Sequence, residues 1–194
     1  LWVADVQNNA VYKINTSGSV MEMIGSPTNT NCNVGESTAA SAARFNQPTD
    51  VAVDAFGNVY VADQLHSYIR KITNGGEVQR YAGKCGVSGS LTGICTDDTL
   101  FLSPYCIERD GLVSYILDDG KVREISENCV VKTLSSAIPF AIAMKVSRNR
   151  TGAGPIIIAD LIDKQLYSLN VDGNRLDEIP VTGNTLSSPS SIDV

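Results

Sequence analysis

The chain has 194 residues, of which 43% are hydrophobic and 19% charged, so it can bury a substantial core as one domain or a large part of one. Its formal net charge of −6 argues against a nucleic-acid backbone as the main partner, because binding phosphates requires an excess of Lys and Arg. No apolar run approaches the length of a membrane-spanning helix.

The first residues predict three short strands rather than a complete sheet. Apolar residues recur over residues 1–5, 10–14 and 20–24, and the turn Thr16–Ser19 separates the last two runs. Since the chain opens inside the first of these strands, at Leu1, we interpret it as a piece of a longer protein. A long polar connection follows and extends to Asn46.

Residues 44–83 form the most regular stretch of the sequence. Short apolar runs at 51–53, 59–61, 69–72 and 78–81 are separated by turn residues, which predicts four antiparallel strands joined by hairpins. A lone four-stranded sheet with two apolar faces is not stable, so it must stack on similar sheets.

Two further sheets are predicted after a second long connection, residues 84–103. One covers 105–134, and the next covers 140–181 with a Gly-rich turn at 147–154. Residues 188–194 repeat the opening of the regular stretch, so the chain holds three complete sheets, three strands of another and one further inner strand. The boundaries between these repeats lie near Pro48, Pro104, Pro139 and Pro189.

The regular stretch resembles an NHL repeat, one blade of a β-propeller. The resemblance is carried by Pro48–Asp54, Gly57–Asp63, the strand Ile69–Ile72 and the exit Ala82-Gly83. It implies an all-β propeller in which residues 1–194 form a single domain or a fragment of one. The family includes protein-binding, RNA-binding and enzymatic members, so the resemblance indicates a fold rather than one function.

Two architectures agree with this tally of strands. The terminal strand after Pro189 could pair with the strand at Leu1 and close a four-bladed ring. Alternatively, the chain is an arc of a larger ring, six blades being usual for the propellers that it resembles. We favour the arc.

Five cysteines are present, without a Cys-x-x-Cys motif or a Cys/His cluster in the sequence. Cys85 and Cys95 flank a loop rich in Gly and Ser, which predicts a disulfide between them. The pairing of Cys32, Cys106 and Cys129 is left open.

Two N-glycosylation sequons, at Asn15 and Asn149, fall in predicted turns. Together with the loop cysteines they favour an extracellular or cell-surface glycoprotein with a disulfide bond. The alternative is a reduced intracellular chain with scattered thiols.

Four aspartates recur at the end of the second strand of each repeat: Asp5, Asp63, Asp118 and Asp160. Carboxylates repeated in every blade are spread around the ring and cannot converge on one ion. We therefore expect each of them to accept backbone N–H groups of the following hairpin turn.

Enzymatic propellers of similar fold usually bind a metal in the central channel. Its mouth is lined here by Asp50, Cys106, Ala141 and Ser191, which do not make a cage of calcium ligands. A zinc site of the lyase type would need several histidines, but the chain has only His66, which we expect to be a solvated turn residue. We expect Cys106 to be a buried, unreactive thiol, and the sequence predicts no catalytic residue, metal or cofactor.

The sequence favours a non-enzymatic recognition or scaffold domain of a secreted or cell-surface protein, which binds protein or glycan through loops on one face. Both long connections join an outer strand to the next inner strand and so lie on the same face. Their candidate binding residues are Asn31, Cys32, Asn33, Glu36, Lys84, Ser88, Asp97 and Asp98.

Two alternatives stay open. The first is a channel-site, metal-dependent hydrolase or lyase with most ligands in blades outside this chain. The second is an intracellular protein-interaction scaffold.

Overall fold

The structure, a computed structural model, describes residues 1–28, 30–32, 37–95, 98–136, 138–149, 152–170, 175–181, 186 and 192. Within these residues the chain forms four antiparallel sheets and two 3-10 turns, η1 (Ala40–Ala42) and η2 (Gln64–His66). No helix in this part of the chain is long and apolar enough to cross a membrane. The predicted all-β fold is confirmed.

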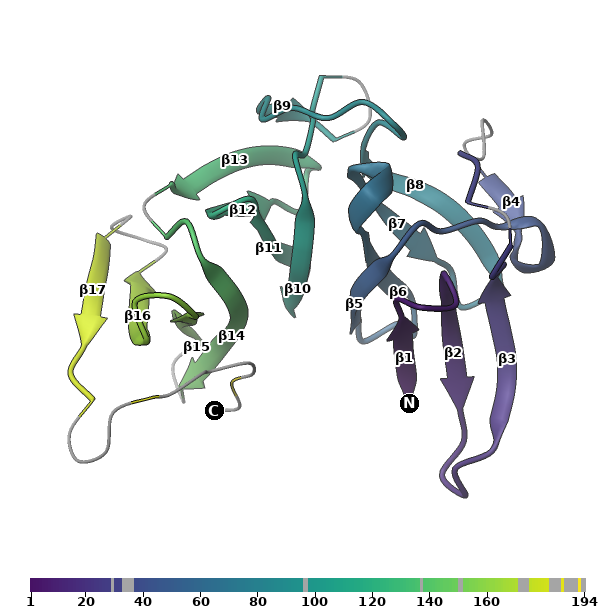
Figure 1. The fold of residues 1–194 in the computed structure, drawn as a ribbon, viewed down its shortest axis with the longest axis horizontal. Coiled ribbons are helices and arrows are strands. Elements are labelled where there is room, and N and C mark those ends of the chain that lie inside the picture. The colour runs from purple at the N-terminus through teal and green to yellow at the C-terminus, as the bar shows by residue number, and fades with distance from the viewer. Residues whose placement is uncertain are drawn as a thin grey trace.

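The sheets follow one another in chain order (Figure 1). Sheet one contains β1 (Trp2–Asp5), β2 (Ala10–Ile14) and β3 (Val20–Gly25). Sheet two contains β4 (Ser37–Ala39), β5 (Pro48–Val53), β6 (Val59–Asp63), β7 (Tyr68–Ile72) and β8 (Glu77–Gly83). Sheet three contains β9 (Gly93–Ile94), β10 (Pro104–Asp110), β11 (Val113–Asp118), β12 (Lys121–Ile125) and β13 (Val130–Ser135). Sheet four contains β14 (Ala141–Asn149), β15 (Gly152–Asp160), β16 (Gln165–Asn170) and β17 (Arg175–Ile179).

The four sheets are arranged side by side in an arc (Figure 1). β5 contacts β1 on one side and β10 on the other, and β10 in turn contacts β14. β5, β10 and β14 are therefore the innermost strands of their sheets, and the hairpin strands that follow each of them extend outward. This is the arrangement of consecutive blades that a β-propeller requires.

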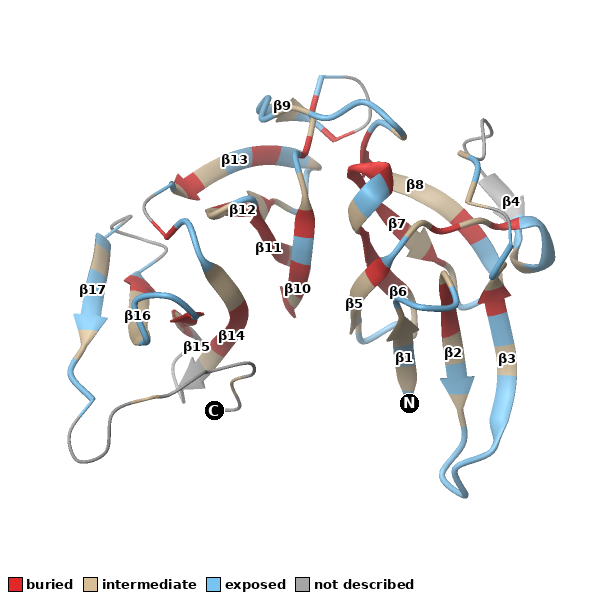
Figure 2. Cartoon of the chain, in the orientation of Figure 1, coloured by how far each residue is buried: buried red, intermediate tan, exposed pale blue. Residues whose placement is uncertain are grey.

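Three hydrophobic clusters fill the spaces between successive sheets. Alternate residues of β6 point to opposite sides: Val59 and Val61 join the cluster shared with sheet one, and Tyr60 and Ala62 join the cluster shared with sheet three. This follows from the two-residue period of a strand. The central strands are thus buried on both faces, whereas the outer strands β3 and β17 are largely exposed (Figure 2).

Both long connections contain a strand that the sequence did not predict. β4 pairs with β8, and β9 pairs with β13, so each adds a fifth strand to the outer edge of the sheet that it leads into. The hairpin of sheet four also differs from the prediction. β14 extends to Asn149 and β15 begins at Gly152, where a turn over 147–154 was expected.

An aspartate at the end of the second strand anchors the start of the innermost strand. The register places Asp63 opposite Pro48, and its Oδ1 accepts the N–H of Asn46 at 2.7 Å. Proline has no N–H to donate, so the carboxylate binds the chain just before it. Oδ1 of Asp118 likewise accepts the N–H groups of both residues that precede Pro104, Leu102 and Ser103, at 2.8 Å each.

The predicted hydrogen bonds to the hairpin turn form at two of the four aspartates. Asp5 accepts the N–H of Asn8 at 3.0 Å, and Asp160 accepts those of Ile162 and Asp163 at 2.9 Å each. The prediction was wrong for Asp63 and Asp118, since among the described residues the backbone donors to their carboxylates come from the segments that enter the innermost strands.

The anchor in sheet three also includes a buried cation. Arg123 donates to Oδ2 of Asp118 at 3.0 Å, and neither side chain is exposed. The same guanidinium donates to the carbonyl oxygens of Leu91 at 2.6 Å and Leu100 at 3.3 Å. The ion pair therefore holds the second long connection against the sheet.

We predict that Asp118→Ala destabilises the protein by about 3–5 kcal/mol, because it leaves Arg123 buried without its counter-ion. Asp5→Ala, at the equivalent position of sheet one, should cost no more than about 1 kcal/mol, because it removes exposed hydrogen bonds within its own turn and leaves no buried charge unpaired. Urea denaturation of the two variants measures both values. Equal losses of stability in the two variants would contradict the anchoring role of Asp118.

Candidate functional site

The two long connections are joined by a disulfide between Cys32 and Cys85, whose Cα atoms are 5.9 Å apart. A second disulfide joins Cys95 to Cys129, with a Cα separation of 5.3 Å. The predicted Cys85–Cys95 disulfide is therefore wrong. All four half-cystines hold the connections to the body of the propeller or to each other.

The tertiary structure explains why Cys85 and Cys95 do not meet. The N–H of Gly86 donates to the carbonyl of His66, which keeps Cys85 beside sheet two. β9 pairs with β13, and the N–H of Cys95 donates to the carbonyl of Cys129 at 2.9 Å, which keeps Cys95 beside sheet three. The connection spans two sheets instead of closing on itself.

His66 lies at the base of these connections and is buried, with 3% of its surface exposed, so its assignment as a solvated residue was wrong. Its Nδ1 is 2.9 Å from Oδ2 of Asp63, and its Nε2 is 2.6 Å from the carbonyl oxygen of Thr30. A carbonyl oxygen only accepts, so Nε2 carries a proton. Burial by itself lowers the pKa of His66, but the hydrogen bond and charge of Asp63 outweigh it and raise that pKa above its ordinary value.

Apolar side chains remain exposed around the joined connections. Leu65 lies in η2, and hydrogen bonds from Gln64 to Ser103 and from Ser67 to the carbonyl of Leu102 hold the segment of Leu102 against this turn. We call this surface the stapled face. Its exposed apolar residues are Leu65, Val87, Leu91, Ile94 and Leu102.

The predicted binding residues lie on or near the stapled face where the structure describes them. Asn31, Lys84, Ser88 and Asp98 are exposed, and Cys32 is half-buried in its disulfide. Asn33, Glu36 and Asp97 lie outside the described residues. The apolar members of this face were not predicted, because an isolated Leu or Ile in a polar loop carries no signal of exposure.

A hollow of about 270 Å³ lies where β5, β10 and β14 approach one another, at the predicted mouth of the channel. Asp50 and Cys106 line it, as expected. Ala143 takes the place of the predicted Ala141, and Ser191 lies outside the described residues, although its neighbour Ile192 lines the hollow.

The register explains the shift from Ala141 to Ala143. Each innermost strand has an irregularity just after its first residue: Pro48 pairs with Asp63, but the next paired residue is Asp50. β14 has the same irregularity and begins at Ala141, so Ala143 is the equivalent of Asp50. The prediction counted from Pro139, which lies two residues before the strand.

The side chains of the hollow join neighbouring innermost strands. Oδ2 of Asp50 accepts the N–H of Ile107 at 2.9 Å, and Thr49 donates to the carbonyl of Tyr105 at 2.7 Å. At the next junction the thiol of Cys106 lies 3.8 Å from the carbonyl oxygen of Met144. These groups hold adjacent sheets together.

Burial raises the pKa of the Asp50 carboxyl, and the N–H of Ile107 offsets this only in part. Burial, followed by the charge of Asp50, raises the pKa of Cys106 well above its ordinary value. A thiol that resists ionisation is a poor nucleophile. The thiol is buried, as expected.

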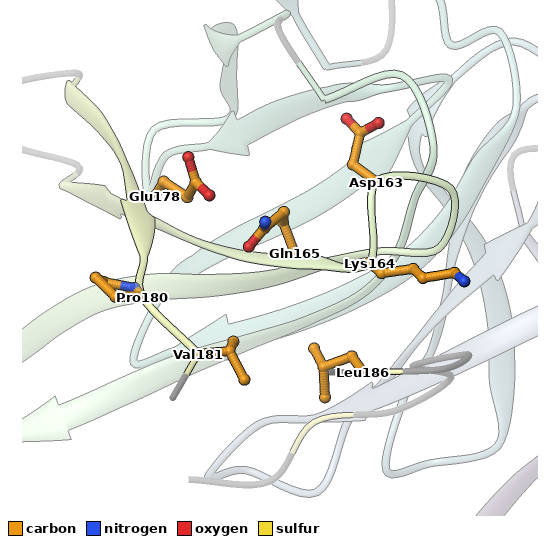
Figure 3. A pocket seen from close by; sticks show the side chains of 7 residues that line it. All are labelled: Asp163, Lys164, Gln165, Glu178, Pro180, Val181 and Leu186. Carbon is orange, nitrogen blue, oxygen red and sulfur yellow. The ribbon is translucent and has the colours of Figure 1, made fainter. Parts of the chain in front are cut away.

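A second hollow, of about 470 Å³, lies between the turn after β15 and the end of β17 (Figure 3). Asp163 and Glu178 contribute carboxylates, but their charged ends and that of Lys164 point in different directions (Figure 3). We assign it no role.

The two sequons have different surroundings. Asn15 is exposed in the turn between β2 and β3, and its Oδ1 accepts the N–H groups of Ser17 and Ser19. Asn149 ends β14 rather than lying in a turn, and its side chain is outside the described part of the chain.

Comparison with known proteins supports the fold. No protein-family model and no curated protein matches the chain. In the crystal structure of a nidogen/laminin complex, a chain matches with a TM-score of 0.63 and 13% identity, over 98% of this chain and 64% of that one. Virginiamycin B lyase from Staphylococcus aureus matches with a TM-score of 0.56 and 13% identity, over 99% of this chain and 69% of the lyase.

A protein of unknown function from Bacteroides thetaiotaomicron matches with a TM-score of 0.55 and 27% identity, over 68% of this chain. The match spans only 31% of that protein. These likenesses support a β-propeller fold, and the NHL type stays a prediction.

We predict that non-reducing peptide mapping by mass spectrometry finds Cys32 linked to Cys85 and Cys95 linked to Cys129, with Cys106 alkylated only after unfolding. Replacing Cys32 and Cys85 together by Ser should cost about 2–4 kcal/mol in urea denaturation, because the disulfide restrains a long loop of the unfolded chain. A peptide that links Cys85 to Cys95 would contradict the pairing.

The raised pKa of Asp50 makes the stability of the folded protein depend on pH. The folded state binds this proton more tightly than the unfolded state, so the contribution of Asp50 to stability is present below the ordinary value of 3.8 and is lost as pH rises through the raised pKa. We predict that the advantage of the wild type over Asp50→Asn shrinks as pH increases across this window, measured by urea denaturation.

Asp54→Asn is the matched control for this measurement. Burial favours a higher pKa for Asp54, but its hydrogen bonds with Asn58, Phe56 and Tyr60 lower the pKa overall. Its contribution is therefore present above 3.8 and is lost as pH falls through the lowered pKa. As pH rises, the stability advantage of the wild type should shrink relative to Asp50→Asn and grow relative to Asp54→Asn. If both differences change with pH in the same direction, the raised pKa of Asp50 is refuted.

Proposed function

We propose that the chain is a non-enzymatic recognition domain of a secreted or cell-surface protein, and that it binds a protein or glycan through the stapled face. The observation that carries this proposal is the fixing of exposed apolar loops by two disulfides. Ordering a loop before binding removes an entropic cost that the partner would otherwise have to offset.

The composition of the stapled face favours a protein over a glycan as the partner. Leu65, Leu91 and Ile94 are each more than half exposed. Exposed apolar side chains gathered on one part of a soluble protein mark surfaces that bind partners. Lys84 and Ser88 supply polar groups for the rim of such an interface.

The two disulfides support the secreted or cell-surface setting, since such bonds persist in oxidising compartments. Glycosylation at Asn15 and Asn149 and membership of the NHL family stay part of the proposal. A larger ring of about six blades also fits, because the chain spans about two thirds of two propeller proteins that it resembles.

A channel-site hydrolase or lyase has less support. The acidic groups of the described channel lining are already engaged: Asp50 binds the backbone, and Glu108 forms a 3.0 Å ion pair with Lys145. An intracellular scaffold would use the same stapled face, but with its cysteines reduced.

We predict that Leu65→Asp combined with Leu91→Asp weakens binding to a partner at least tenfold, because interface hot spots are buried apolar anchors. The assay is surface plasmon resonance with partners selected from arrays of purified extracellular proteins and of glycans. Phe56→Asp is the matched control, since Phe56 is 69% exposed in the turn between β5 and β6, away from the joined connections. Equal weakening by both changes would contradict the proposed face.

A further inference from the structure

Three potential metal ligands meet at the base of the stapled face. One ring nitrogen of His66 and the Sγ atoms of Cys32 and Cys85 all lie within 4.8 Å of one another. Two thiolates and an imidazole are ligands that zinc prefers. We propose that Cys32, Cys85 and His66 bind a zinc ion when the Cys32–Cys85 disulfide is reduced.

His66 is already oriented as a zinc ligand. Its Nδ1 is held by Asp63, which leaves Nε2 as the coordinating nitrogen. A carboxylate behind a metal-binding histidine fixes the ring and strengthens the ligand. Asp63 is itself fixed, because its other oxygen accepts the N–H of Asn46. Coordination would replace the hydrogen bond between Nε2 and the carbonyl of Thr30.

The two sulfurs must separate to bind an ion, and a glycine lies beside one of them. Bonds of 2.3 Å to a tetrahedral zinc separate two sulfurs by roughly 3.8 Å, so the bonded Sγ atoms must move apart. Gly86 has a φ of +71°, and a Cβ at this position would lie 3.5 Å from Sγ of Cys32. Gly86 therefore places no side chain against Sγ of Cys32. Three protein ligands leave the fourth position to water.

A dithiol can reduce the Cys32–Cys85 disulfide and so free both thiols. The dithiol gives two electrons and two protons to the S–S bond and leaves as its own disulfide, while Cys32 and Cys85 become thiols. Zinc binding then releases three protons, one from each thiol as it becomes a thiolate and the one that Nε2 of His66 carries. The metal and the disulfide are therefore alternative links between the same two connections, one for reducing and one for oxidising conditions.

The Cys95–Cys129 disulfide differs from the Cys32–Cys85 disulfide in having no histidine or acidic ligand beside it among the described residues. Among the described residues, the only group of three or more Cys, His, Asp or Glu that could hold a metal is Cys32, His66 and Cys85. Cys95 and Cys129 have no such third ligand there. Reduction should therefore create one metal site, not two.

The test is metal titration of the whole chain before and after reduction by a phosphine, which leaves as its oxide with oxygen from water. After anaerobic removal of the phosphine, cobalt should bind the reduced protein at one equivalent with a thiolate-to-cobalt charge-transfer band, and zinc should displace it. The oxidised protein should show no such band.

Three variants locate the site. Cys32→Ser with Cys85→Ser should abolish the band, and His66→Gln should weaken binding at least tenfold. Cys95→Ser with Cys129→Ser is the matched control and should leave it unchanged. The proposal is overturned if the reduced wild type takes up no metal, or if the first double variant binds as tightly as the wild type.

Circular dichroism distinguishes a folding failure from a missing site. If reduction unfolds the chain and zinc restores the native spectrum, the proposal is supported. A reduced chain that stays unfolded with zinc counts against it.

Discussion

The propeller depends on the hydrogen bonds between three second-strand aspartates, Asp63, Asp118 and Asp160, and the segments that enter the innermost strands. An innermost strand must turn sharply from the preceding sheet into the centre of the ring, and prolines at its start remove a backbone donor. The carboxylates of Asp63 and Asp118 are buried at these points and bind the N–H groups just before the prolines. Without them, buried backbone groups would lack partners at each junction, which is costly.

The same aspartates connect the scaffold to the stapled face. Asp63 orients His66, whose Nε2 donates to Thr30 in the first connection. Asp118 pairs with Arg123, which donates to Leu91 and Leu100 in the second connection. The two disulfides and these buried polar contacts together hold the long connections against the sheets. A rigid sheet body with firmly attached loops is suited to recognition.

The hollow at the centre of the arc shows how one position serves structure in different blades. Asp50 and Cys106 are equivalent in register, and each contacts the backbone of the next innermost strand. Ala143, at the same position in sheet four, has no polar group to contribute. A varied set of side chains around a channel mouth therefore need not indicate a catalytic centre.

The sequence by itself determined the repeat and most of its strands and hairpins, because a two-residue apolar period and turn residues are local signals, but it did not reveal β4 and β9. It also located the recurring aspartates and the two channel residues Asp50 and Cys106. Only the tertiary structure decided which cysteines pair, because the partners are 53 and 34 residues apart and are brought together by the docking of β9 and Gly86. Likewise, His66 looks like a turn residue along the chain and becomes buried only when a distant connection covers it.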